Sequence, residues 1–341
     1  MTKTPFQTPS ARLLQECRGQ EITIPNLLDL CPGWEYRPSL FTADKVEAAL
    51  DEWREEWITS QKLLKDNKRA NVSFLALGTL PDADLRSIVT IAKWTAFVFL
   101  FDDALDYDEF KDMAAARETY CTEAVNCVKQ SMLAEDDIYR DLSSIAPVYK
   151  TACSFYEIGY EIRQKMKNGN SLAFSVMMLK MESDFFCYSA NLQDWICHYI
   201  THYIDSAINL DTHNDTGEIL EVDRYLDLRM HTCAICPSLV LYVYAYNIEL
   251  PRWILEHNIS RRMIRLVSTI GAVDNDMYSL KKELALESNL LDLVPAAHVS
   301  ETKRLVSAWK ECRAGLASWH YSTKRYYGDV AGNAGAITVQ L

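Results

Sequence analysis

Long apolar runs, repeats and an excess of basic residues are all missing from this chain of 341 residues. The longest uncharged apolar stretch, residues 233–246, spans 14 positions and contains Pro237, whereas a membrane helix needs about 20 apolar residues. The N-terminus lacks the apolar segment of a secretory signal peptide. Asp and Glu (47) outnumber Lys and Arg (35), giving a formal net charge of −12, and nucleic-acid binding needs clustered basic side chains. We therefore expect no membrane span, no nucleic-acid partner and a cytoplasmic location.

Glycine, proline and alternating strand patterns are also scarce. The chain has 11 Gly and 10 Pro, and its apolar residues recur at the spacing of an amphipathic helix. This pattern predicts helices over about 42–65, 81–106, 113–133, 147–167, 171–209, 221–247, 251–285 and 300–326, with breaks at 168–170 and 212–217. Long helices with short connections indicate an all-α fold, a single-domain helical bundle.

Irregular signals concentrate at the two ends of the chain. Residues 1–40 include Pro25 and Pro38, and we expect them to form an irregular N-terminal lead-in. Residues 328–341 contain several glycines and are expected to form a flexible C-terminal tail. The helical domain should therefore occupy residues 41–327.

The cysteines and histidines form no strong metal or disulfide pattern. The ten cysteines have no regular short spacing, which indicates small buried side chains in a reducing compartment. Cys233 and Cys236 make one C-x-x-C pair, and His198 and His202 lie one helical turn apart. Because a second C-x-x-C and an H-E-x-x-H motif are both missing, ordinary packing is the expected role of these pairs.

A stripe of oxygen ligands is one of two patterns with a strong functional signal. Asn275, Ser279 and Glu283 stand at i, i+4 and i+8, so at about 100° per residue they share one face of a helix. Two neutral oxygens and one carboxylate suit Mg²⁺, a cation that shares its shell with waters and substrate phosphates. The stripe therefore predicts a magnesium site with a phosphate ligand.

The other pattern is an aspartate cluster that follows an apolar stretch. Residues 91–101 would bury a helix up to the point where Asp102, Asp103 and Asp106 appear. Asp102 and Asp106 share one helical face, while Asp103 lies about 100° away. Acids at a helix C-terminus oppose the macrodipole, so a cation should offset them. We expect Asp102 and Asp106 to ligate metal directly and Asp103 to support them.

Together these two patterns resemble the signatures of the class I terpene synthases, and those of fungal sesquiterpene synthases in particular. Residues 102–106 match an aspartate-rich DDxxD motif, and residues 275–283 match an NSE triad of the form NDxxSxxxE, with Met277 where the family usually has Leu, Ile or Val. The resemblance implies an all-helical bundle with a central active-site cavity. It also implies an isoprenyl diphosphate substrate and three Mg²⁺ ions.

Further residues match the diphosphate-binding positions of that family, and they are Arg229, Lys282, Arg325 and Tyr326. Arg229 lies 46 residues before Asn275, where the family has a diphosphate-sensing arginine on a helix break. Guanidinium forks and a lysine point charge would neutralise a departing diphosphate. The chain differs from bacterial relatives at Thr232 and Cys233, where they carry Asp and Gly.

The resemblance also implies a reaction. Loss of diphosphate from a linear substrate, which we expect to be farnesyl diphosphate, would give a carbocation that cyclises to a sesquiterpene hydrocarbon or alcohol. Such a cation needs a dry cavity with aromatic walls, for which Phe99 and Trp319 are candidates, with simple core packing as the equal alternative. We expect the protein to be a monomer or a homodimer.

A catalytically silent binding module with the same fold is disfavoured, because every expected ligand is present, and two further alternatives stay open. One is a diterpene cyclase that uses geranylgeranyl diphosphate. The other is a chain-elongating isoprenyl diphosphate synthase, which is disfavoured because no Arg pair follows Asp106 and no second DDxxD motif is present.

Overall fold

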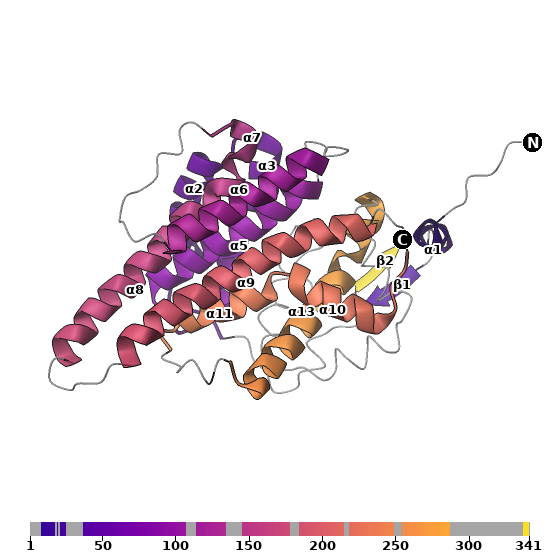
Figure 1. Cartoon of the computed structure of the whole chain (residues 1–341). Helices are drawn as coiled ribbons and strands as arrows, with labels where there is room; N and C mark the ends of the chain where they lie inside the picture. The colour runs from indigo at the N-terminus through magenta and orange to yellow at the C-terminus, as the bar shows by residue number, and fades with distance from the viewer. Residues whose placement is uncertain are drawn as a thin grey trace, which may run out of the picture. The chain divides into compact units, whose positions relative to one another are not determined.

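The computed structural model describes residues 8–17, 19, 21–24, 37–106, 114–133, 145–177, 184–214, 218–248, 254, 256–286 and 337–340. Their main elements are α1 (Pro9–Cys17), β1 (Glu21–Ile24), α2 (Ala43–Trp57), α3 (Gln61–Arg69), α4 (Val72–Thr79), α5 (Leu85–Asp106), α6 (Ala114–Leu133), α7 (Pro147–Lys150), the 3-10 turn η2 (Ala152–Ser154), α8 (Phe155–Met177), α9 (Asp184–Asn214), α10 (Val222–Thr232), α11 (Ile235–Ala245), α13 (Asn258–Leu286) and β2 (Ile337–Gln340) (Figure 1). The predicted all-α class is confirmed. No described helix combines the length and the hydropathy that a membrane span requires.

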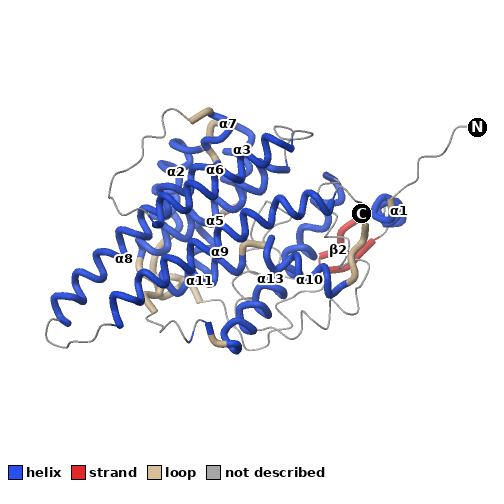
Figure 2. Tube along the Cα trace, viewed as in Figure 1, coloured by secondary structure: helices blue, strands red, loops and turns tan. Residues whose placement is uncertain are grey.

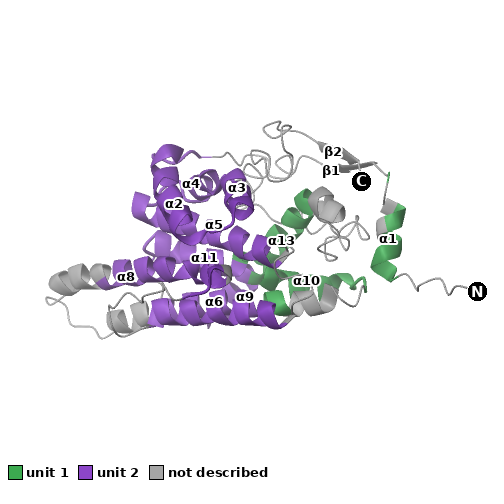
Figure 3. Ribbon diagram, turned by 90° about the horizontal axis from the view of Figure 1, so that it is seen from above, with its two compact units in different colours: residues 1–36, 206–235, 265–341 green, residues 37–205, 236–264 purple. Residues whose placement is uncertain are grey.

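The chain divides into two compact units, each of which is described by itself (Figure 3). Unit 1 comprises Met1–Tyr36, Ser206–Ile235 and Arg265–Leu341, and unit 2 comprises Arg37–Asp205 and Cys236–Ile264. The aspartate cluster belongs to unit 2, whereas the NSE triad belongs to unit 1. The domain limits at residues 41 and 327 stay a prediction.

Helix α5 is deeply packed within unit 2. It contacts α2, α3, α4 and α8, and α6 lies along α8 (Figure 1). Its aromatic rings pack centroid to centroid within 6.2 Å of rings from other helices, in pairs that join Trp94, Phe97 and Phe101 to Tyr120, Phe155 and Tyr203. Such pairs add about 0.5–1.5 kcal/mol each beyond the burial of their area. The helix that carries the aspartate cluster is therefore held firmly along its apolar length.

Three hydrogen bonds also fix α5 within unit 2. Lys93 Nζ donates to Glu157 Oε1 at 2.7 Å and to Glu161 Oε1 at 2.6 Å, both on α8. On the side of α3, the amide of Asn67 donates to the carbonyl oxygen of Ala96 at 2.8 Å. Because these groups are largely withdrawn from water, their hydrogen bonds specify the position of α5 as well as stabilising it.

Gly159 marks a close approach of α8 to α6. A Cβ at this position would overlap Ser131 Oγ and lie 2.7 Å from Ser131 Cβ. Gly159→Ala should therefore force the two helices apart and lower the free energy of unfolding by about 1–3 kcal/mol, as measured by urea denaturation. The double variant Gly159→Ala/Ser131→Gly removes the obstructing atoms and should recover part of that loss. Wild-type stability of the single variant would contradict the close approach.

Several helix boundaries differ from the sequence prediction. The predicted helix over 42–65 is interrupted, because Ile58 is extended and the Ser60 hydroxyl caps α3 by accepting from the Leu63 N–H at 3.4 Å. The break predicted at 168–170 is wrong, because α8 continues through it. Asn and Gly lower helix propensity by only about 1 kcal/mol or less per residue, which tertiary packing can offset.

Regular elements also occur near both ends of the chain, within unit 1. Strands β1 and β2 pair in antiparallel fashion, with Ile22 opposite Val339 and Ile24 opposite Ile337 (Figure 2). The predicted irregular lead-in therefore contains the regular elements α1 and β1, and β2 lies within the predicted C-terminal tail, whose flexibility stays a prediction. β-branched residues favour strands, but strands more than 300 residues apart in sequence leave no local signal of their pairing.

Candidate functional site

Helix α10 ends at a sharp break, and Arg229 lies in its last turn. The Cys233 N–H bonds the carbonyl oxygen of Arg229 at 3.2 Å. Ala234 then has a φ of 58°, a left-handed conformation that costs a non-glycine residue about 1–2 kcal/mol, and α11 begins at Ile235. The single helix predicted over 221–247 is therefore wrong, because apolar spacing alone does not show the break. The break lies just after Arg229, where the family resemblance implies one.

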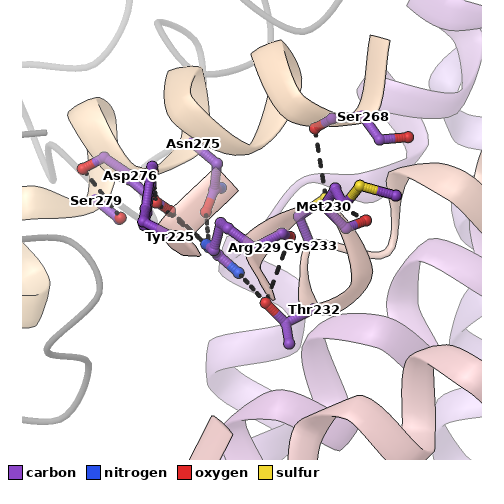
Figure 4. A network of polar contacts seen from close by, with 9 residues as sticks. All are labelled: Tyr225, Arg229, Met230, Thr232, Cys233, Ser268, Asn275, Asp276 and Ser279. Carbon is purple, nitrogen blue, oxygen red and sulfur yellow. Dashed lines mark hydrogen bonds and ion pairs between the residues drawn. The ribbon is translucent and has the colours of Figure 1, made fainter. Parts of the chain in front are cut away.

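The Arg229 side chain reaches from α10 to α13 (Figure 4) and is only 7% exposed. Its Nε lies 2.8 and 3.1 Å from the two carboxylate oxygens of Asp276, and its Nη2 lies 2.6 Å from Asp276 Oδ1. The same Nη2 donates to Asn275 Oδ1 at 3.2 Å, and Nη1 donates to Thr232 Oγ1 at 3.2 Å. Guanidinium–carboxylate forks are among the strongest hydrogen bonds in proteins, so this pair joins the two helices.

Asp276 is fully buried, at 0% exposure, and accepts a further hydrogen bond from the Tyr225 hydroxyl (Figure 4). Tyr225 and Arg229 stand at i and i+4, so both reach α13 from one face of α10. A buried carboxylate needs a cation and hydrogen-bond donors to offset its lost hydration. Tyr225 and Arg229 supply both to Asp276.

Asn275 and Ser279 lie one turn apart on α13 and present neutral oxygens. Asn275 is half-buried, and Ser279 is 3% exposed with its Oγ 3.5 Å from the Asp276 carbonyl oxygen. Two neutral oxygens on one helical face fit a hard cation such as Mg²⁺, which prefers oxygen ligands. Among the described residues, no three His, Cys, Asp or Glu side chains form a group that could hold a metal ion. The side chains of Lys282 and Glu283, on the same helix, lie outside the described residues.

The predicted aspartate ligands occupy the last turns of α5 in unit 2. Asp102 is exposed, whereas Asp103 is only 2% exposed, so the two side chains lie on different sides of the helix, as their separation of about 100° requires. Phe99, one turn earlier, is half-buried. Asp106 is the last residue of α5, and its side chain lies outside the described residues.

Of the predicted site residues, the structure brings Arg229, Asn275 and Ser279 together within unit 1. Other predicted positions, Trp319, Arg325 and Tyr326, lie outside the described residues. The His198 and His202 rings of unit 2 are stacked with an interplanar angle of 2° and centroids 6.1 Å apart.

Two residues of this cluster, Tyr225 and Asp276, were not predicted from the sequence. Their positions along the two helices do, however, contain a signal for them. Asp276 directly follows the Asn of the triad and lies about 100° round α13 from Asn275, so its side chain points away from that of Asn275. Tyr225 stands one turn before Arg229, which is the spacing of two side chains that meet a common partner.

Residues 93–302, more than half of the chain, match the family model described as terpene synthase family 2, C-terminal metal binding. The match begins within α5 and includes α10 and the described part of α13. It therefore covers the aspartate cluster, Arg229 and the NSE triad.

Individual relatives are distant but similar over most of their length. A terpene cyclase of Annulohypoxylon truncatum is 23% identical over 92% of this chain and 88% of its own. The silphinene synthase of Penicillium patulum is 22% identical over 96% of this chain and 82% of its own. Among solved structures, the linalool/nerolidol synthase of Streptomyces clavuligerus in complex with 2-fluorogeranyl diphosphate has a TM-score of 0.57 at 16% identity, and the match covers 84% of this chain and 83% of that one.

Proposed function

The chain belongs to the terpene synthase family and is a class I terpene cyclase that acts on a prenyl diphosphate, and we propose that it ionises farnesyl diphosphate with the help of Mg²⁺ and cyclises the product to a sesquiterpene. The observation that carries the proposal is the 3.2 Å contact between Arg229 and Asn275. It joins the expected diphosphate sensor to an expected metal ligand 46 residues away in sequence. Relatives that are sesquiterpene cyclases support the choice of a C15 substrate.

Oxygen ligands from both motifs would hold the metal. They are Asp102 and Asp106, supported by Asp103, and the triad Asn275, Ser279 and Glu283. Bound there, Mg²⁺ would neutralise charge on the diphosphate oxygens; the family resemblance implies three ions. The neutral oxygens of Asn275 and Ser279 support this role, because they satisfy a hard cation without adding negative charge beside an anionic substrate.

Three basic side chains and one tyrosine hydroxyl would bind the diphosphate directly. Arg229, Lys282, Arg325 and Tyr326 would donate hydrogen bonds to its oxygens, and these bonds strengthen as charge develops on the leaving group. The allylic C–O bond would break with both electrons going to oxygen, which leaves an allylic carbocation. Aromatic faces such as those proposed for Phe99 and Trp319 would stabilise the moving positive charge. Loss of a proton or attack by water would then end the reaction.

Product analysis tests this proposal. The purified protein is incubated with Mg²⁺ and either farnesyl diphosphate, geranylgeranyl diphosphate, or farnesyl diphosphate with isopentenyl diphosphate, and the extracts are examined by gas chromatography with mass detection. We expect a cyclic C15 hydrocarbon or alcohol in the first arm. A cyclic C20 product in the second arm alone would identify a diterpene cyclase. A longer diphosphate in the third arm, or simple hydrolysis in every arm, would contradict the proposal.

A further inference from the structure

The proposed metal-binding role of Asn275 and Ser279 does not explain why the neighbouring Asp276 is buried. Asp276 follows Asn275 in the chain and is 0% exposed. Both of its carboxylate oxygens are engaged by donors on α10, Oδ1 by Arg229 Nε and Nη2 and Oδ2 by Arg229 Nε and the Tyr225 hydroxyl. A carboxylate bound in this way acts on its neighbours rather than on a metal ion.

One nitrogen atom links this carboxylate to a proposed metal ligand. Arg229 Nη2 lies 2.6 Å from Asp276 Oδ1 and 3.2 Å from Asn275 Oδ1 (Figure 4). Because a guanidinium N–H can only donate, the atom of the Asn275 amide that faces it must be the oxygen. The contact therefore decides which way the amide is turned. A carbonyl oxygen has two lone pairs, so it can accept this hydrogen bond and still bind a cation.

We propose that Asp276, assisted by Tyr225, is a positioning residue that holds Arg229 in place, so that Arg229 orients the Asn275 amide oxygen for Mg²⁺. The inference rests on the proposed function, since it takes Asn275 as a metal ligand. The Asp276 charge has a second effect: it offsets the guanidinium, which would otherwise repel a metal ion bound beside it. Partners that hydrogen-bond a metal ligand typically change metal affinity by about 10–100-fold.

The primary test measures the binding of Mn²⁺ alone, followed by the electron paramagnetic resonance signal of the free ion. The relevant site is the Mn²⁺ binding that Asn275→Ala removes. Asp276→Asn should weaken that site by about 10–100-fold, and Tyr225→Phe should weaken it less. Asp227→Asn is the matched control, because it removes an acid of α10 whose ion pair with Arg265 of α13 is exposed, at 59% and 58%. This control should bind Mn²⁺ as the wild type does.

The change in Mn²⁺ affinity caused by Arg229→Met distinguishes a positioning role from a simple charge effect, because the two predict changes in opposite directions. If only charge mattered, removing a cation beside a cation site would tighten Mn²⁺ binding. The inference predicts the opposite, a weaker site, because the Asn275 amide loses the donor that orients it. Tighter binding by Arg229→Met, or wild-type binding by Asp276→Asn, would overturn the inference.

The double variant Arg229→Met/Asp276→Asn shows whether weaker Mn²⁺ binding in the single variants results merely from loss of folding. It replaces a buried ion pair with neutral side chains, a change that is often close to neutral for stability, whereas either single variant leaves a buried charge without its partner. Because both residues act through one orientation of Asn275, the double variant should bind Mn²⁺ no more weakly than the weaker single variant. An additive loss, or wild-type affinity in this variant, would contradict the inference. Failure of Asn275→Ala to remove any Mn²⁺ binding would instead contradict the metal role on which the proposed function rests.

Discussion

Asn275→Ala should reduce kcat/KM for farnesyl diphosphate by about a thousandfold or more. Metal ions that neutralise a leaving group contribute several kcal/mol to the transition state, and about 4 kcal/mol corresponds to a thousandfold. The fold should survive, because Asn275 is only half-buried and the substitution adds no bulk. The measurement is a steady-state assay of diphosphate release at several Mg²⁺ concentrations, with a thermal melt of each variant.

Asn258→Ala provides the control for that experiment. Asn258 is an exposed asparagine at the first position of the same helix, α13, so it undergoes the same chemical change without touching the proposed site. Its activity should stay within about twofold of wild type, since exposed substitutions away from special features change little. Wild-type turnover by Asn275→Ala at low Mg²⁺ would show that the triad is misassigned.

Lys93→Met should cause a large loss of stability, about 3–5 kcal/mol in the free energy of unfolding. Lys93 is 6% exposed and lies between the carboxylates of Glu157 and Glu161. Burial by itself would lower the pKa of the Lys93 ammonium, but the charges of Glu161 and Glu157 and the hydrogen bonds to them outweigh it, so the pKa is raised. The lysine is therefore charged at neutral pH, and its removal leaves two neighbouring carboxylates without their cation. Urea denaturation measures the difference.

Two further variants test the reason for that loss. Lys68→Met breaks an ion pair to Asp51 whose side chains are 47% and 44% exposed, and such surface pairs contribute only about 0–1 kcal/mol. Lys93→Met/Glu161→Gln also removes one of the two carboxylate charges that Lys93→Met leaves without a cation, and it should recover part of the stability. If Lys93→Met were no more harmful than Lys68→Met, α5 would not depend on this network.

The local patterns in the sequence were informative because they depend only on helical spacing. Asn275 and Ser279 were predicted to share a helical face, and the structure places them one turn apart on α13. Asp102 and Asp103 were expected to point in different directions, and one is exposed while the other is buried. The helical geometry that relates neighbours along one element is fixed by the backbone itself.

The features that depend on contacts between distant segments were not predictable in the same way. The ion pair of Arg229 and Asp276 joins residues 47 apart, and nothing in the local pattern around Asp276 names its partner. The local pattern did not show the break at Ala234, because alanine favours helices; only the family resemblance implied a break near Arg229. The pairing of β1 with β2 was hidden because its partners lie at opposite ends of the chain.

We propose that the aspartate cluster and the NSE triad bind metal ions that contact one diphosphate. The most direct measurement is a crystal structure of the protein grown with Mn²⁺ and inorganic diphosphate, in which anomalous scattering locates each Mn²⁺ ion. We predict Mn²⁺ at Asp102 and at Asn275 and Ser279, with a single diphosphate that touches both sets of ions and Arg229. Mn²⁺ at only one motif, or a diphosphate that contacts neither set, would contradict it.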